Sequence, residues 1–148
     1  MPRFTAAGRG VTNLPTTVAG PCVIGSANAQ LHIREVGVFN TTATAVAVGL
    51  MRGSTAVGVG VGAVTVSKWN KDAVGTNSTA FTSNTGGTSP TSDGVFGRAA
   101  LGAAIGSGMV WTFGEEGLIV PNLTTASFHI VCPTGTAQFL DFYIVWDE

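Results

Sequence analysis

The residues of this chain that could carry out chemistry are few and widely spaced. Its only histidines are His32 and His129, and the sequence around each predicts a strand, where a solvated or hydrogen-bonded histidine is the ordinary role. Catalysis needs several converging groups with tuned pKa values. Glu115 and Glu116 could supply paired carboxylates, but adjacent side chains on a turn point apart. This set of residues therefore predicts no active site.

The sequence also contains no convincing pattern of a catalytic nucleophile or of metal ligands. Cys22 and Cys132 lie far apart in the sequence, which excludes a CxxC metal or redox pair. They can form a disulfide only if their strands are neighbours, and two buried thiols are expected in a protein made in a cytosol. Gly106-Ser107-Gly108 has only a faint likeness to the Gly-x-Ser-x-Gly turn of hydrolases. We therefore expect no enzyme activity, no cofactor and no metal site.

A glycine-rich run resembles a phosphate-binding loop at first sight. Residues 57–62 read Val-Gly-Val-Gly-Val-Gly. A phosphate loop lies between a strand and a helix whose N-terminus holds the anion, whereas residues 63–67 favour a further strand. The run therefore indicates a strand with a glycine face that another backbone or ring can approach closely.

The composition limits the fold and the partners. A chain of 148 residues with 45% apolar residues is long enough for one domain with a real core. Charged residues make up only 10%, against about 25% in a typical soluble domain. This deficit favours a surface covered partly by neighbouring subunits, because obligate interfaces are depleted in charge. A net charge of −1 with scattered basic residues predicts no nucleic-acid partner.

The charges are unevenly distributed along the chain. Residues 1–98 hold all seven basic residues and three acidic ones, whereas residues 99–148 hold five acidic residues and no basic one. Chance in a sparse set of charges is one interpretation. The other is a head-to-tail contact, in which the early residues of one subunit meet the late residues of another.

The first part of the chain predicts an arm followed by a hairpin. Residues 1–29 contain frequent proline and glycine, which weaken regular structure. They predict an extended N-terminal arm, with a short strand near residues 22–24, that lies either on a neighbouring subunit or on its own domain. Residues 30–39 and 43–52 are predicted as two strands of a β-hairpin, joined by the Asn40-Thr41-Thr42 turn.

Simple alternation assigns the side chains of residues 30–39 to two faces. One face would carry Leu31, Ile33, Gly37 and Phe39, and the other His32, Arg34, Val36 and Val38.

The middle of the chain predicts a long loop. Residues 70–94 are rich in Thr, Ser, Asn and Gly and exceed the usual length of a loop without structure of its own. We expect it to point outward, with Trp69 at its start and Phe81 within it. Residues 95–107 are ambiguous, because their alanines favour one or two helical turns while Gly102 and Gly106 oppose them.

Residues 108–147 predict a succession of four short strands separated by turns. The strands are expected over residues 109–113, 118–120, 126–132 and 138–146. With the earlier strands they predict an all-β fold with little helix, a single-domain antiparallel β-sandwich or jelly roll over residues 30–148.

Three stretches carry a resemblance to a known group of proteins. They are Val-Gly-Val-Phe-Asn-Thr-Thr-Ala-Thr-Ala-Val-Ala-Val at 36–48, Leu-Gly-Ala-Ala-Ile-Gly-Ser-Gly-Met-Val-Trp-Thr-Phe-Gly at 101–114, and the ending Trp146-Asp147-Glu148. In these stretches the chain resembles small virion proteins of tailed bacteriophages, and among them capsid decoration, or cement, proteins most. The resemblance implies a compact, commonly trimeric β domain on the outside of the head that clamps adjacent major capsid subunits. Small tail or baseplate proteins are the alternative.

These considerations set the expected partners and surfaces. We expect contacts with the major capsid protein and with copies of the chain itself, as a homotrimer, on the capsid exterior of a virion made in the host cytoplasm. No stretch resembles a signal peptide, and no run of about 20 apolar residues could span a bilayer, so no membrane partner is expected. The residues expected at these contacts are Arg3, Phe4, Arg9, Arg34, Phe139, Tyr143 and Trp146.

A carbohydrate-binding role is a second hypothesis. Sandwich lectins use one or two aromatic side chains beside Asn and Asp on loops, and Trp69, Trp111 and the 70–94 loop could do this. Packing in a core or an interface is the alternative role of each tryptophan. The expected ligand would be a glycan of the host surface.

Overall fold

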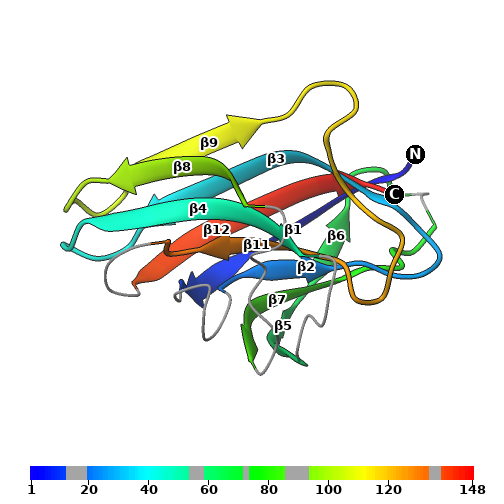
Figure 1. Cartoon of the computed structure of the whole chain (residues 1–148), viewed down its shortest axis with the longest axis horizontal. Helices are drawn as coiled ribbons and strands as arrows, with labels where there is room; N and C mark the ends of the chain where they lie inside the picture. Colours follow the sequence, from blue (N-terminus) through cyan, green and yellow to red (C-terminus); the bar gives the residue numbers. More distant parts are fainter. Residues whose placement is uncertain (13–19, 54–58, 72–73, 86–93, 134–137) are drawn as a thin grey trace.

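The computed structural model describes residues 1–12, 20–53, 59–71, 74–85, 94–133 and 138–148. These residues form twelve strands and no helix, arranged as two antiparallel sheets, which confirms the expected all-β sandwich (Figure 1). The strands are β1 (Arg3–Val11), β2 (Cys22–Ile24), β3 (Leu31–Asn40), β4 (Val46–Gly53), β5 (Val59–Val64), β6 (Val66–Lys68), β7 (Thr79–Thr85), β8 (Val95–Leu101), β9 (Gly108–Thr112), β10 (Leu118–Val120), β11 (Ser127–Val131) and β12 (Phe139–Asp147).

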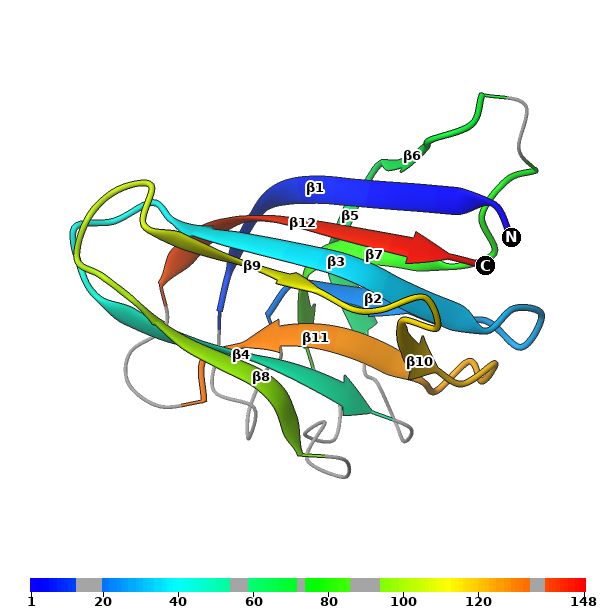
Figure 2. The same ribbon diagram turned by 90° about the horizontal axis from the view of Figure 1, so that it is seen from above.

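Each sheet contains six strands. The first has the order β10-β3-β12-β1-β6, and β9 extends it along the same edge of β3 as β10. The second has the order β5-β7-β2-β11-β4-β8. Figure 2 shows the two layers from the side, with β1, β12 and β3 in one and β2, β11 and β4 in the other.

The core lies between the two layers and is filled by alternate residues of their strands. Phe4 and Trp146 are opposite each other on β1 and β12, and their ring centroids lie 6.1 Å apart. Phe128 and Ile130 of β11 face them from the other sheet and are fully buried. β11 is buried at all five positions, so it lies at the centre of its sheet with both faces covered.

Residues 3–11 differ from the predicted N-terminal arm. They form β1, which pairs with β12 over nine residues and with β6 on its other side. One of the glycines that suggested weak structure, Gly10, is a site of close packing, since a Cβ atom there would overlap Thr82 O. Pro2 precedes the strand, where its missing N–H removes no ladder hydrogen bond. Residues 13–19 of the predicted arm lie outside the described residues.

The predicted hairpin over residues 30–52 is wrong, because its two strands lie in different sheets. β3 pairs with β12, β9 and β10, whereas β4 pairs with β11 and β8. Asn40 holds the connection, since its Nδ2 donates to Thr44 O (2.7 Å) and Gly102 O (3.0 Å). The Asn40 amide therefore supplies hydrogen bonds to backbone carbonyl groups of the connection that carries the chain from one sheet to the other.

A bulge in β3 changes the predicted assignment of faces. The register with β12 shifts between Val145, opposite Glu35, and Trp146, opposite Ile33, which leaves Arg34 as the extra residue. Leu31 and Ile33 are buried before the bulge, and Val36 and Val38 are buried after it. Simple alternation therefore fails after Ile33, and Gly37 and Phe39 lie on the outer face.

The middle of the chain contains more strand than predicted. β7 lies within the residues expected as a loop and pairs with β2 and β5, while residues 72–73 and 86–93 lie outside the described residues. Ala80 and Asn84 of β7 are buried, as is Ser78 directly before it, so the alternation of buried positions is carried by small and polar side chains. The ambiguous residues 95–101 form β8 rather than helical turns. The predicted glycine face is confirmed at Gly60, which lies beneath the Phe81 ring.

Candidate functional site

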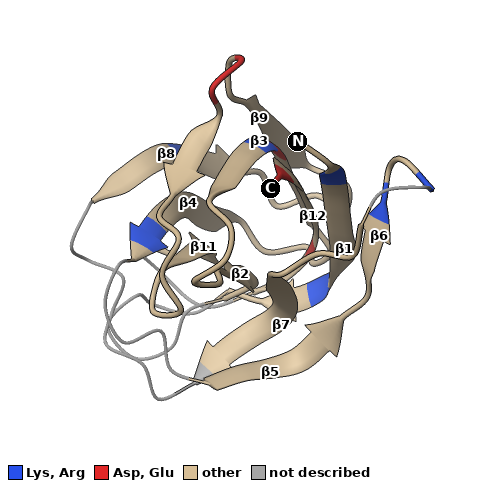
Figure 3. Cartoon of the chain, turned by 90° about the vertical axis from the view of Figure 1, so that its right-hand side faces the viewer, with Lys and Arg blue, Asp and Glu red and all other residues tan. Residues whose placement is uncertain are grey.

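The outer face of the first sheet carries three ion pairs. The register of β1 and β12 sets Arg3 opposite Asp147 and Arg9 opposite Asp141. Side chains at opposite positions on one face of an antiparallel pair are neighbours. Each arginine donates two hydrogen bonds to its aspartate, and the Nε···Oδ1 distance is 2.7 Å in both pairs. Figure 3 shows charged residues on β1, β3 and β12, whereas β5 and β7 have none among their described residues.

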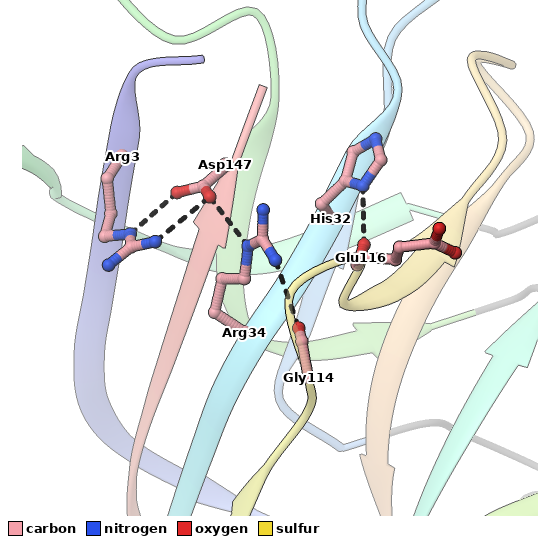
Figure 4. Close-up of polar contacts among 6 residues, drawn as sticks. All are labelled: Arg3, His32, Arg34, Gly114, Glu116 and Asp147. Atoms are coloured by element: carbon pink, nitrogen blue, oxygen red, sulfur yellow. Dashed lines mark hydrogen bonds and ion pairs between the residues drawn. The ribbon is translucent and has the colours of Figure 1, made fainter.

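Asp147 is shared by a second arginine from β3. Arg34 Nε donates to Asp147 Oδ2 over 2.7 Å, so the carboxylate lies between two guanidinium groups (Figure 4). Burial alone would raise the pKa of Asp147, but the hydrogen bonds and charges of Arg3 and Arg34 together outweigh it and lower this pKa. We call these three residues the Arg–Asp–Arg cluster.

These pairs explain the uneven distribution of charge along the sequence. Early arginines meet late aspartates within one chain, because β1 and β12 are neighbours in the first sheet. Arg3, Arg9 and Arg34 thus have carboxylate partners in their own chain, and the head-to-tail contact between subunits stays a prediction.

The Arg–Asp–Arg cluster also fixes the turn between β9 and β10. Arg34 Nη1 donates to Gly114 O over 3.1 Å. His32 Nδ1 lies 2.7 Å from Glu116 O, and because a carbonyl oxygen can only accept, Nδ1 is the donor (Figure 4). His32 thus has the hydrogen-bonded strand role expected from the sequence.

Tyr143 is the centre of the aromatic part of this face. Its ring stacks on Phe39, with centroids 6.4 Å apart, and covers Gly37. Its hydroxyl donates to Glu35 Oε1 over 2.6 Å. Burial first, and then the hydrogen bond and charge of Glu35, raise the pKa of Tyr143 to about 12, so the phenol stays protonated at neutral pH.

Two hollows meet at Trp69, which directly follows β6. Its indole is 62% exposed, and the Arg3 guanidinium carbon lies 5.6 Å from the ring centroid. One hollow has a volume of about 690 Å³, and its lining includes Arg3, Asn70 and Asp147 beside Trp69. The other, of about 340 Å³, shares Trp69 and Arg3 and is further lined by residues of β3, β12 and the 112–115 segment.

Glu148 joins the end of the first sheet to the segment before β7. Its carboxylate accepts hydrogen bonds from the hydroxyls of Thr76 and Ser78, from Asn77 N (2.8 Å) and from Trp146 Nε1 (3.0 Å). Burial raises the pKa of Glu148, but these donors outweigh it and lower the pKa overall.

The second histidine is buried in the second sheet. His129 on β11 lies opposite Cys22 of β2, and its Nε2 is 2.5 Å from Ser127 Oγ. Its Nδ1 is buried and has no hydrogen-bond partner among the described residues. Burial lowers the pKa of His129 to about 4, so the ring is neutral at physiological pH. The two histidines lie in different sheets, and the structure does not bring them together.

Both cysteines are buried thiols that form no disulfide, as expected. Cys22 is on β2 and Cys132 follows β11, so their strands are neighbours, but Cys22 lies opposite His129 in the register. Burial raises the pKa of Cys22 to about 12, which keeps it a thiol rather than a reactive thiolate.

The residues expected at subunit contacts separate into two groups. Phe4 and Trp146 are fully buried in the core, so their expected place at a contact surface is wrong, because alternation along β1 and β12 turns them inward. The others lie on the outer face of the first sheet: Arg3, Arg9, Arg34, Phe139 and Tyr143.

The two aromatic residues expected on an outward loop, Trp69 and Phe81, lie in different surroundings. Trp69 is exposed, whereas the ring of Phe81 lies against Gly60 in the sheet. Trp111 is half-buried and packs against the core; a Cβ at Gly97 would lie 2.9 Å from its Nε1. Of Trp69 and Trp111, only Trp69 therefore presents most of its ring to solvent.

Two edge strands expose apolar side chains on the same side of the sandwich. Among the described strands, β8 pairs only with β4, and β9 pairs only with β3. They follow each other through the turn at residues 102–107 and lie next to one another in Figure 1. The exposed apolar residues of this segment, which we call the β8–β9 edge, are Val95, Phe96, Ile105, Met109 and Val110.

Comparison with known proteins found no matching family model, no matching curated protein and no matching solved structure. Within the described ranges, no three His, Cys, Asp or Glu side chains are grouped so as to hold a metal ion. The same ranges contain no helix long and apolar enough to cross a membrane.

Proposed function

We propose that this chain is a structural protein of a tailed-bacteriophage particle, and most specifically a capsid decoration protein. It acts by contact, without a reaction of its own. It binds the outside of the head, where it stabilises contacts between major capsid proteins, and it assembles with copies of itself as a homotrimer.

The observation that carries this proposal is the β8–β9 edge. β9 has the sequence Gly-Met-Val-Trp-Thr, with no charge, and Met109 and Val110 are both more than two-fifths exposed. Soluble proteins usually protect an edge strand with charges, prolines or a covering element, because its unpaired backbone groups accept another strand. An edge strand without charge and with exposed apolar side chains, as in β9, favours burial against another subunit.

Two further observations support the same function. Leu101–Gly114, a stretch that carries the resemblance to phage virion proteins, includes the turn and β9 of this edge. Three arginines of the outer face, Arg3, Arg9 and Arg34, are paired with aspartates inside the chain, which favours shape and apolar contact as the means of association. Many weak contacts of this kind become jointly strong once a shell presents them in an array.

The location is tested on purified particles of the phage that encodes the chain. Mass spectrometry is expected to find the chain in many copies per particle, and an image of particles carrying a tagged chain is expected to show the tag on the head. A tag on the tail or baseplate would replace decoration by the alternative structural role. Absence of the chain from purified particles would overturn the whole proposal.

Self-association is tested by light scattering of the purified chain at micromolar concentration. We expect a trimer, and Val110→Lys is expected to dissociate it because it places a charge on the β8–β9 edge. Val59→Lys is the matched control, since it makes the same change at an exposed position of β5, the opposite edge of the second sheet. A monomeric wild type, or equal dissociation by both variants, would contradict the proposed edge contact.

A further inference from the structure

Trp69 is held on a rigid part of the sheet although its side chain is exposed. Its backbone N–H donates to Arg3 O over 3.0 Å, which continues the pairing of β6 with β1. The Arg3 guanidinium beside its ring is itself fixed by two hydrogen bonds to Asp147. The indole is therefore presented in a set position, which lowers the entropic cost of binding a ligand.

The two hollows give this indole the surroundings of a ligand site. Their volumes, about 690 Å³ and about 340 Å³, lie in the range of small-molecule sites, and both are lined by Trp69 and Arg3. Planar polar groups border the ring on both sides. They are the guanidinium groups of Arg3 and Arg34, the carboxylates of Glu35, Asp147 and Glu115, and the amide of Asn70.

An apolar ring beside paired donors and acceptors matches the chemistry of a sugar. The C–H face of a pyranose ring is apolar and stacks on an indole, while adjacent hydroxyls at its rim donate and accept in pairs. Guanidinium, carboxylate and amide groups offer two donor or acceptor atoms in one plane, which suits such pairs.

A polyanion fits this site less well. Asp147 already compensates one of the two arginine charges, and Glu35 and Glu115 add two negative charges at the smaller hollow. Stacking of a nucleic-acid base on Trp69 would bring its phosphates towards these carboxylates. A saccharide with few negative charges avoids this repulsion.

We propose that Trp69, Arg3 and the polar residues around the two hollows form a saccharide-binding site. The ligand is a pyranose, stacked on the indole with its hydroxyls bound by the neighbouring planar groups. That it belongs to a bacterial surface glycan rests on the proposed function. The site lies next to the chain ends on the outer face of the first sheet (Figure 2). It extends from Trp69, beside β6, to Thr112 at the end of β9 and the residues 113–115 that follow it. It contains none of the exposed apolar residues of the β8–β9 edge, on which the structural role depends.

The test is an array of oligosaccharides from lipopolysaccharide O-chains, capsules and teichoic acids, probed with the whole wild-type chain. Affinity for each bound saccharide is then measured by isothermal titration calorimetry, which does not depend on the indole that the variant removes. Trp69→Ala is expected to weaken binding at least tenfold, since the exposed indole supplies the stacking surface. Glu115→Gln is expected to change affinity or selectivity by a smaller factor, because it alters the border of one hollow only.

Trp111→Phe is the matched control, since it also removes an indole but at a packed position. It is expected to leave affinity within twofold of the wild type. No bound saccharide, binding unchanged by Trp69→Ala, or preferential binding of single-stranded DNA would overturn the site. Incorporation of Trp69→Ala into particles is scored separately, so that failure of the saccharide site is distinguishable from failure of the structural role.

Discussion

The ring of Tyr143 on β12 lies directly on Gly37 of the neighbouring strand β3, where a Cβ atom would overlap the ring. Gly37→Ala is therefore expected to push Tyr143 away from Phe39 and from its hydrogen bond to Glu35. We predict a loss of about 1–3 kcal/mol in the free energy of unfolding, the usual cost of an added methyl group in a packed site. Urea denaturation measures this loss.

A double-mutant cycle isolates the cause of that loss. In a Tyr143→Ala background, Gly37→Ala is expected to cost less, because the overlapping ring is absent. Gly75→Ala is the matched control, since a Cβ there meets no atom within 4 Å. Equal costs of Gly37→Ala in both backgrounds would show that Tyr143 is not the obstacle.

The Arg–Asp–Arg cluster predicts a loss of stability in acid. Since the pKa of Asp147 is lowered in the folded chain, its contribution is complete above the unfolded value of about 4 and is lost as the pH falls through the folded value. Asp147→Asn is expected to lower stability at pH 7 by about 2 kcal/mol, because hydrogen bonds to a charged group are lost. It should also flatten the decline in melting temperature below pH 4.

Asp141→Asn is the control for the cluster. It removes an aspartate from a single arginine pair whose two side chains are about half exposed, where solvent weakens the interaction. We expect a smaller loss than for Asp147→Asn. A loss as large as that of Asp147→Asn would mean that the second arginine and the burial of Asp147 add nothing.

His129 predicts a second, separate pH dependence. Its folded pKa of about 4 lies below the unfolded value of about 6.5, so the unfolded chain binds a proton first as the pH falls. Stability is therefore expected to decrease between about pH 6.5 and pH 4, by up to about 3 kcal/mol. His129→Gln should remove this slope, as measured by urea unfolding at pH 7, 6 and 5. An unchanged slope in the variant would contradict the assignment to His129.

Glu148 predicts a local effect on the segment before β7. Glu148→Gln removes the charge that five side-chain and backbone donors of residues 76–78 and 146 approach. We expect a loss of about 1–2 kcal/mol and faster hydrogen exchange of the Asn77 and Ser78 amides. Glu116→Gln is the control, because Glu116 is exposed and uses its backbone oxygen, not its carboxylate, in the structure. Unchanged exchange at both amides would contradict the role of Glu148.

The sequence predicted the fold class and most strands of the last third because their alternation is carried by large apolar side chains. Leu140, Phe142 and Ile144 are all buried on one face, as a period of two requires. β7 was missed because its buried positions hold Ala80 and Asn84, and Ser78 is buried directly before it; these residue types resemble a loop in composition. The alternation of residue types therefore identified strands whose buried side chains are apolar, and it failed for a strand whose buried side chains are small or polar.

Pairing between distant strands was harder to predict than the strands themselves. The bulge at Arg34 and the layer change at Asn40 are set by tertiary contacts that local alternation does not contain. One signal was present: Arg3 and Arg9 are separated by the same number of positions as Asp141 and Asp147. Equal spacing of opposite charges is what an antiparallel pair of β1 and β12 requires.

The neighbouring places of the first and last strands have a consequence for how the chain is made. β12 lies between β1 and β3, yet it leaves the ribosome after every other strand of the sheet. Until then β1 and β3 lack their common neighbour, and each has one edge without a partner strand. Completion of this layer must await the synthesis of β12, and contacts between strands so far apart in the sequence form slowly.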